Sequence, residues 1–265
     1  MYRIGLKVWS INKNYIKDAV SLYKEGVYDY IELFSVPGSY EMCIDWWKDL
    51  DIPYVIHAPH SGCNMNFAKK EFLDSNLKMA FEALKYADTL KAEIVIFHPG
   101  VEGDIKETAF QINKINDSRM TIENKPYYAL HDNLINNGYS PEDIKFLKES
   151  CNIGFCLDIP HAIYSANSQK IDRLSYLEKF IKLNPIIFHI YDGDYFGVYD
   201  YHKKFGEGSF SFGEIFKILP LNRPISIETP KKSKENLEDF KQDAYFLKGL
   251  FSSAEEIPEK WTEKI

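Results

Sequence analysis

The chain has 265 residues, of which 45% are hydrophobic, and carries a formal net charge of -7 at neutral pH. This hydrophobic content excludes an intrinsically disordered chain, and no apolar run approaches the roughly 18 residues of a membrane helix. The acidic balance excludes a protein that holds nucleic acid mainly by a bulk positive field, although bound divalent cations can reverse the potential of one face.

The N-terminal segment and the cysteines indicate a cytoplasmic protein. The segment MYRIGLKVWS is typical of a strand and lacks the long apolar core of a signal peptide. The four cysteines, at positions 43, 63, 151 and 156, show no CxxC spacing. We therefore expect reduced, mostly buried thiols rather than disulfides or a zinc ribbon.

Eight short segments rich in β-branched and aromatic residues recur at fairly even intervals. Most of the connections between them carry apolar residues at helical spacing, as at Leu73, Leu77, Ala80 and Leu84. Apolar strands that alternate with amphipathic helices are typical of a parallel sheet buried on both faces. The predicted strands are residues 3–10, 28–34, 53–58, 92–98, 119–124, 152–158, 185–192 and 224–229.

Eight β/α units in about 250 residues match the size of a (β/α)8 TIM barrel. The chain has no Pro/Gly/Ser-rich linker or low-complexity tract, so we expect residues 1–265 to form a single domain. A doubly wound open sheet is the structural alternative. Such a sheet more often has a glycine-rich first turn, which the segment WSINKNY is not.

Metal-ligand side chains stand near the carboxyl ends of six predicted strands, where barrel enzymes build their active sites. Each one alone also suits a structural role, but buried carboxylates that face one another cost several kcal/mol each unless cations neutralise them. Imidazole and carboxylate ligands fit zinc, manganese or iron, and nine ligands are too many for one ion, so two or three ions are predicted. The nine candidates are His57, His98, Glu123, Asp158, His161, His189, Asp200, His202 and Glu228.

The order of these motifs resembles the endonuclease IV family of apurinic/apyrimidinic endonucleases, within the xylose isomerase-like TIM barrel superfamily. From His57 to Glu228 the chain carries a histidine, FHPG, a strand-end glutamate, DxxH, a further histidine, DxH followed by GEG, and a last glutamate. The resemblance implies a trinuclear zinc centre that hydrolyses a phosphodiester, such as abasic DNA. The implied ligands are His57, His98 and Glu123 for the first ion; Glu123 as a bridge, with Asp158, His189 and Glu228, for the second; and His161, Asp200 and His202 for the third.

The same resemblance implies roles in catalysis and substrate binding. Glu123 would orient the nucleophile as well as the metals. We expect His60 and Lys203 or Lys204 to contact phosphate, and His131, in the long connection 125–140, to cover a small ligand. The side chains implied in catalysis are Glu123, His98, Asp158 and Glu228.

Two segments depart from the family at the positions that read DNA. The segment ELFSVPGSY has no arginine, and HAPHSGCNMNF places His60 and Ser61 where an aromatic wedge is expected. The resemblance therefore covers the metal chemistry more fully than the recognition of DNA.

Two other functions remain open. Sugar isomerases and epimerases of the same superfamily use a reduced set that corresponds to Glu123, Asp158, His189 and Glu228, with the two glutamates moving a proton beside a carbonyl. Glu32 in the segment YIELF also resembles those enzymes. The third reading is a non-catalytic binding module that keeps its metals.

Overall fold

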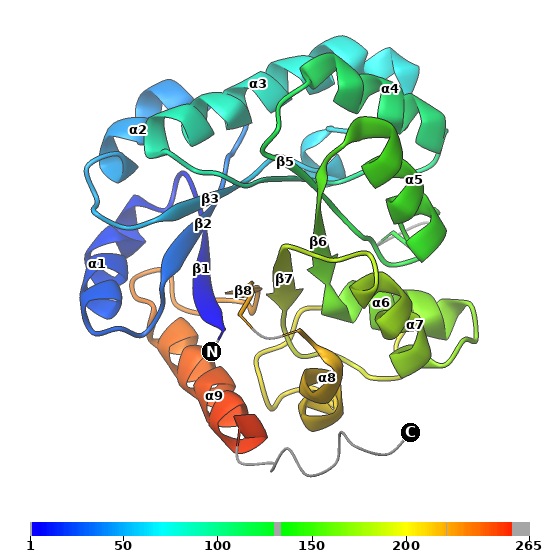
Figure 1. Cartoon of the computed structure of the whole chain (residues 1–265). Coiled ribbons are helices and arrows are strands. Elements are labelled where there is room, and N and C mark those ends of the chain that lie inside the picture. The colour runs from blue at the N-terminus through cyan, green and yellow to red at the C-terminus, as the bar shows by residue number, and fades with distance from the viewer. Residues whose placement is uncertain (1, 130–133, 221, 256–265) are drawn as a thin grey trace.

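The computed structural model describes residues 2–129, 134–220 and 222–255, and its core is a closed barrel of parallel strands (Figure 1). Each strand pairs with the next along the chain, and the last pairs with the first. The predicted TIM barrel and all eight predicted strands are confirmed. They are β1 (Arg3–Trp9), β2 (Tyr30–Phe34), β3 (Tyr54–His57), β4 (Val95–Phe97), β5 (Met120–Glu123), β6 (Gly154–Asp158), β7 (Ile187–Ile190) and β8 (Pro224–Ile227).

Helices surround the barrel on the outside (Figure 1). Their ends follow local signals: Ser140 caps α5 by accepting from the Asp143 backbone N–H, Pro141 is its first residue, and Asn152 ends it in the left-handed region. Two helices, α6 and α7, share the connection between β6 and β7. The helices are α1 (Ile16–Lys24), α2 (Tyr40–Trp47), α3 (Leu73–Leu90), α4 (Ile105–Ile115), α5 (Pro141–Cys151), α6 (Ile159–Ser168), α7 (Arg173–Ile181), α8 (Phe212–Ile218) and α9 (Glu238–Glu255), with 3-10 turns at Lys13–Tyr15, Ser61–Cys63 and Lys70–Phe72.

The strands alternate between a face toward the helices and a face toward the barrel interior. Outward side chains such as Leu6 and Ile122 join the large core beneath the helices. The interior is filled at one level by a separate apolar cluster of Tyr30, Val55, Ile96, Cys156 and Ile187.

Gly5 faces the same interior, and a Cβ there would lie 2.4 Å from Tyr30 Cζ. The aromatic ring therefore takes the space that a side chain at position 5 would need. The next inward position of β1, two residues further on, is Lys7, which lies beyond this apolar layer.

Two of the four cysteines are buried, fewer than the mostly buried thiols that the sequence predicted. All four cysteines are free, and Cys43 and Cys156 are buried, whereas Cys63 and Cys151 are partly exposed. In the described part of the chain, every helix is too short or too polar to cross a membrane.

Candidate metal centre

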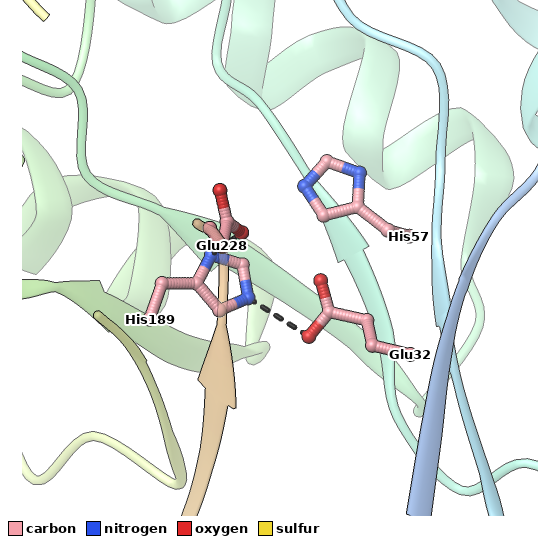
Figure 2. Close-up of side chains that lie close together, drawn as sticks. All are labelled: Glu32, His57, His189 and Glu228. Atoms are coloured by element: carbon pink, nitrogen blue, oxygen red, sulfur yellow. Dashed lines mark hydrogen bonds and ion pairs between the residues drawn. The ribbon is translucent and has the colours of Figure 1, made fainter. Parts of the chain in front are cut away.

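Polar side chains fill the barrel interior at the carboxyl ends of the strands. Glu32, His57 and His189 come from β2, β3 and β7, and all three are at most 1% exposed. Glu228 follows β8 directly, and Figure 2 shows these four side chains converging on one point. Their ligand atoms lie within 4.8 Å of one another.

Glu123, the last residue of β5, is the central carboxylate of the site. Its Oε2 lies 3.2 Å from His57 Nε2, 3.1 Å from His98 Nε2 and 3.2 Å from His189 Nδ1. Burial raises the pKa of Glu123, but the neighbouring histidines and Lys125 outweigh it and hold that pKa well below its usual range. We call His57, His98, Glu123, His189 and Glu228 the inner cluster.

The second oxygen of Glu123 faces a different group of side chains. Oε1 lies 3.2 Å from His161 Nδ1 and 3.2 Å from Lys125 Nζ. His161 Nε2 in turn lies 3.0 Å from Asp200 Oδ2, and Asp200 Oδ1 lies 3.3 Å from His202 Nε2. We call His161, Asp200 and His202 the outer cluster. Glu123 is thus placed to bridge the two clusters.

His57 shows why a cation fits the inner cluster. Its Nδ1 lies 2.7 Å from the Ala58 carbonyl, which can only accept, so Nδ1 carries the proton. Burial lowers the pKa of His57, which keeps the ring neutral and leaves Nε2 as an unprotonated acceptor. That acceptor faces the Glu123 carboxylate, and a cation bound by both removes the repulsion between them.

The outer cluster repeats this arrangement. His161 Nδ1 lies 2.9 Å from the Asn124 carbonyl, and His202 Nδ1 lies 2.7 Å from the Glu228 carbonyl. Each ring donates one N–H to a backbone carbonyl and turns its other nitrogen toward Asp200. Burial alone would lower the pKa of His161, but nearby carboxylates raise it to about 10. The metal-free ring is therefore protonated, and the proton on Nε2, which faces Asp200, occupies the position where a divalent cation could bind.

The orientation of His189 is fixed by the carboxylate of Glu32. Its Nε2 lies 3.0 Å from Glu32 Oε2 (Figure 2). The other nitrogen, Nδ1, is buried and makes no hydrogen bond with any described residue, and it faces Glu123 and Glu228 Oε1, the latter at 2.8 Å. A carboxylate that fixes one imidazole nitrogen while the other points into the site is the usual support of a metal-binding histidine.

Buried charge gives a second argument that the residues present fit metal ions. Among the described residues, five carboxylates (Glu32, Glu123, Asp158, Asp200 and Glu228) surround the site, and the charges of three lysines (Lys7, Lys125 and Lys231) act on them. Within this set, the carboxylates outnumber the lysines by two. Asp158 Oδ2 is buried without a hydrogen bond to the described part of the chain, and burial raises the pKa of this carboxyl to about 7.

The predicted ligands fall into several groups of atoms within 4.8 Å of one another. His57, His98 and Glu123 form one group, and the outer cluster forms another; these are the sets that the family resemblance implies for the first and third ions. The four ligands implied for the second ion do not form one group. Among the described residues, Asp158 lies with Glu123 and His161, His189 lies with Glu123 and Cys156, and His189 and Glu228 lie with Glu32 and His57.

The predicted substrate residues differ in position. His60 lies at the site, where its ring stacks on His98 with centroids 5.3 Å apart, and burial, aided by His57, lowers its pKa to about 3. Lys204 points away, because its Nζ bonds Asp239 Oδ1 at 2.5 Å. Lys203 lines a cavity of about 400 Å³ together with Tyr164, Asp194, Tyr201 and residues 196–199, and His131 lies outside the described residues.

Asp192 holds the loop that carries Asp200 and His202, two of the three residues of the outer cluster. This buried carboxylate accepts from the backbone N–H groups of Gly206, at 2.9 Å, and Gly208, at 3.0 Å. Its own backbone pairs in both directions with Lys203. A Cβ at position 208 would lie 2.2 Å from Asp192 Oδ1, so the loop can pass this close only with glycine there.

Two lysines of the site were not predicted. Lys7 Nζ bonds Glu228 Oε1 and lies 3.2 Å from Glu32 Oε1. Lys125 Nζ lies 3.2 Å from Glu123 Oε1 and 3.4 Å from His161 Nε2. The available signals were a charge inside the apolar strand RIGLKVW and a lysine two residues after the strand-end glutamate.

The barrel, with histidines and carboxylates at the carboxyl ends of its strands, defines a class of barrel protein equipped to bind metal ions. The chain belongs to the xylose isomerase-like TIM barrel family, whose model matches residues 25–250. The protein MJ1614 of Methanocaldococcus jannaschii, which is uncharacterized, is 26% identical over 241 residues, covering 84% of this chain and 89% of that protein.

Two solved structures of differently named proteins share the fold of this chain. A D-tagatose 3-epimerase-like protein has a TM-score of 0.71 and 20% identity, covering 95% of this chain and 98% of its own. Endonuclease IV from Thermus thermophilus has a TM-score of 0.69 and 20% identity, covering 96% of this chain and 99% of its own. At such identities the likeness shows the fold alone, so the function has to be argued from the side chains.

Proposed function

We propose that this chain is a metal-dependent enzyme that hydrolyses phosphodiesters with two or three divalent ions, zinc first among them. The observation that carries the proposal is the outer cluster of His161, Asp200 and His202, which adds a second group of ligands beside Glu123. The isomerase reading needs only the smaller set on the strands. A ligand group beyond that set supports a reaction in which more than one ion acts on the substrate.

The residues of the site have distinct parts in this reaction. Bound divalent ions would supply Lewis acidity, which activates a water and neutralises a phosphate. Glu123 contacts both the inner and the outer cluster, and it would orient the water that attacks the phosphate. Lys125 is placed to meet an anionic substrate, because its ammonium group stands beside Glu123 Oε1 and His161. Tyr191 donates to Asp200 and stacks on the ring of His202 with centroids 3.6 Å apart, which holds both ligands still.

The substrate is proposed to be abasic DNA or another phosphodiester. Support for DNA comes from the resemblance in motif order and from the fold shared with endonuclease IV. The segments 32–40 and 57–67 lack the arginine and the aromatic wedge, so a smaller phosphodiester is an equal candidate. The rings of Tyr127 and Tyr128 pack edge to face with centroids 4.8 Å apart, and Tyr128 also contacts Tyr199; such an aromatic group would suit a flat part of a substrate.

One arrangement favours a sugar isomerase or epimerase as the second candidate. Glu123 Oε2 and Glu228 Oε1 flank the same nitrogen of His189, at 3.2 and 2.8 Å. Two glutamates on either side of one metal ligand suit the transfer of a proton at the carbon beside a carbonyl. The fold shared with a D-tagatose 3-epimerase-like protein agrees with this candidate.

The test supplies zinc- or manganese-loaded protein with an abasic-site duplex, with bis(4-nitrophenyl) phosphate and with a set of keto-sugars. Cleavage of either phosphodiester, abolished by EDTA, supports the hydrolase. Interconversion of a keto-sugar, with both phosphodiesters intact, would replace it by the isomerase. Fully loaded protein without either activity would indicate a metal-bearing binding module.

A further inference from the structure

Lys7 lies inside the barrel, between the two carboxylates at the base of the site. Its side chain is 15% exposed, and its Nζ bonds Glu228 Oε1 and lies 3.2 Å from Glu32 Oε1. Glu32 is fully buried, and Glu228 is only 9% exposed. A buried lysine between two carboxylates offsets charge that would otherwise need a metal ion.

Glu32 and Glu228 also belong to a group of side chains whose ligand atoms are close enough together to hold a metal ion. Glu32, His57, His189 and Glu228 offer ligand atoms within 4.8 Å of one another. Both oxygens of Glu32, however, already face donors. Oε2 accepts from His189 Nε2 and from Ser226 Oγ, and Oε1, which makes no hydrogen bond with the described residues, faces the ammonium group of Lys7.

Ser226 extends this network toward the apolar layer of the barrel. Its Oγ donates to Glu32 Oε2, and the hydroxyl of Tyr30 lies 2.9 Å from the same Oγ. Tyr30 is the ring that requires glycine at position 5. Strand residues therefore hold Glu32 in place: Ser226 and His189 contact its Oε2, and Lys7 faces its Oε1.

We propose that Lys7 is a resident cation that takes the place of a metal ion at the base of the site, and that Glu32 is a positioning residue for Lys7 and His189 rather than a metal ligand. Glu228 then keeps only Oε2 for a metal, because Oε1 is held by Lys7. This inference rests on the metal-binding part of the proposed function and does not depend on which reaction is catalysed.

The test compares the full-length chain with its Lys7→Met variant, after EDTA treatment and after loading with zinc. Without metal, we expect the variant to melt roughly 10 °C below the wild type, because two buried carboxylates lose their cation. With zinc, we expect most of this difference to disappear and the variant to bind one more equivalent than the wild type. An equal loss of melting temperature with and without zinc, at unchanged metal content, would overturn the proposal.

Lys204→Met is the matched control. Lys204 is 12% exposed and pairs with the carboxylate of Asp239, away from the clusters. Its loss should change the melting temperature by the same amount with and without zinc. A zinc-dependent rescue of this control, equal to that of Lys7→Met, would show that the rescue is unspecific and would also overturn the proposal.

A double variant decides the matter if Lys7→Met does not fold in either condition. Lys7→Met combined with Glu32→Gln removes one cation and one carboxylate, so the charge at the base of the site stays balanced. We expect this double variant to fold without metal and to be more stable than the single variant. Failure of the double variant to exceed the single one would contradict the role assigned to Lys7. Because stability and metal content are read, loss of the hydrolase proposal would leave this result intact.

Discussion

The inner and outer clusters offer similar ligands but are held in place by different means. The inner cluster stands on or directly after barrel strands, whose parallel pairing fixes each side chain; Glu123, for example, pairs with Cys156 across β5 and β6. In the outer cluster, Asp200 and His202 come from an irregular loop that Asp192 secures through backbone hydrogen bonds. The strands therefore provide rigidity, and the loop provides the part that distinguishes this site from a smaller one.

Glu123→Gln should have the largest effect, because the Glu123 carboxylate touches both clusters. The amide cannot bridge cations as a carboxylate does, so phosphodiester hydrolysis should fall by several orders of magnitude. The measurement is the rate of cleavage at saturating zinc. Glu207→Gln is the control, since Glu207 pairs with Lys232 at the surface and should leave the rate unchanged. A rate for Glu123→Gln close to that of the control would refute its role.

Gly208→Ala should affect the outer cluster alone. The added methyl group meets Asp192 Oδ1 at 2.2 Å, so the loop must move, and we expect hydrolysis to fall by about 10–100-fold. Gly213→Ala is the matched control, because a Cβ at position 213 has no neighbour within 4 Å among the described residues. Metal titration would show weakened binding of one ion and unchanged binding at the inner cluster. Equal kinetics for the two variants would contradict the role of Asp192.

A smaller effect concerns the pH dependence of stability in the metal-free protein. The carboxylates of Asp158 and Asp200 outweigh burial and raise the pKa of His161 from 6.5 to about 10. The stabilisation from protonated His161 is therefore complete below pH 6.5 and is lost as the pH rises through about 10. Urea unfolding across this range should show a decline that is weaker in His161→Asn. Parallel curves for the two proteins would exclude this contribution.

The sequence was sufficient to predict the barrel and many of the side chains that gather at the carboxyl ends of its strands. Strands buried on both faces produce apolar runs, and parallel pairing brings their carboxyl ends together, so residues such as His57 and Glu123 could be placed without coordinates. The outer cluster was predicted for a weaker reason, the resemblance of DxH and GEG to a known motif. Its position depends on Asp192, whose role depends on backbone contacts across the loop.

Lys7 and Lys204 show what the sequence could not provide. Lys7 stands in an apolar strand, and its partners Glu32 and Glu228 are 25 and 221 residues away in the chain, so its role appears only when the barrel closes. Lys204 follows His202 by two residues and was expected near phosphate, but its ammonium group forms an ion pair with Asp239 on α9 and points away from the site. Long-range ion pairs of this kind leave no periodic signal in the sequence.

The metal content of the wild type and of His202→Ala tests the central claim most directly. His202 is partly exposed and lies outside the apolar core, so its loss should not unfold the barrel. Elemental analysis after dialysis should find at least two divalent ions per wild-type chain and one fewer in the variant, with similar melting temperatures for the two metal-free proteins. A single ion in both proteins, or global unfolding of the variant, would contradict the existence of two separable clusters.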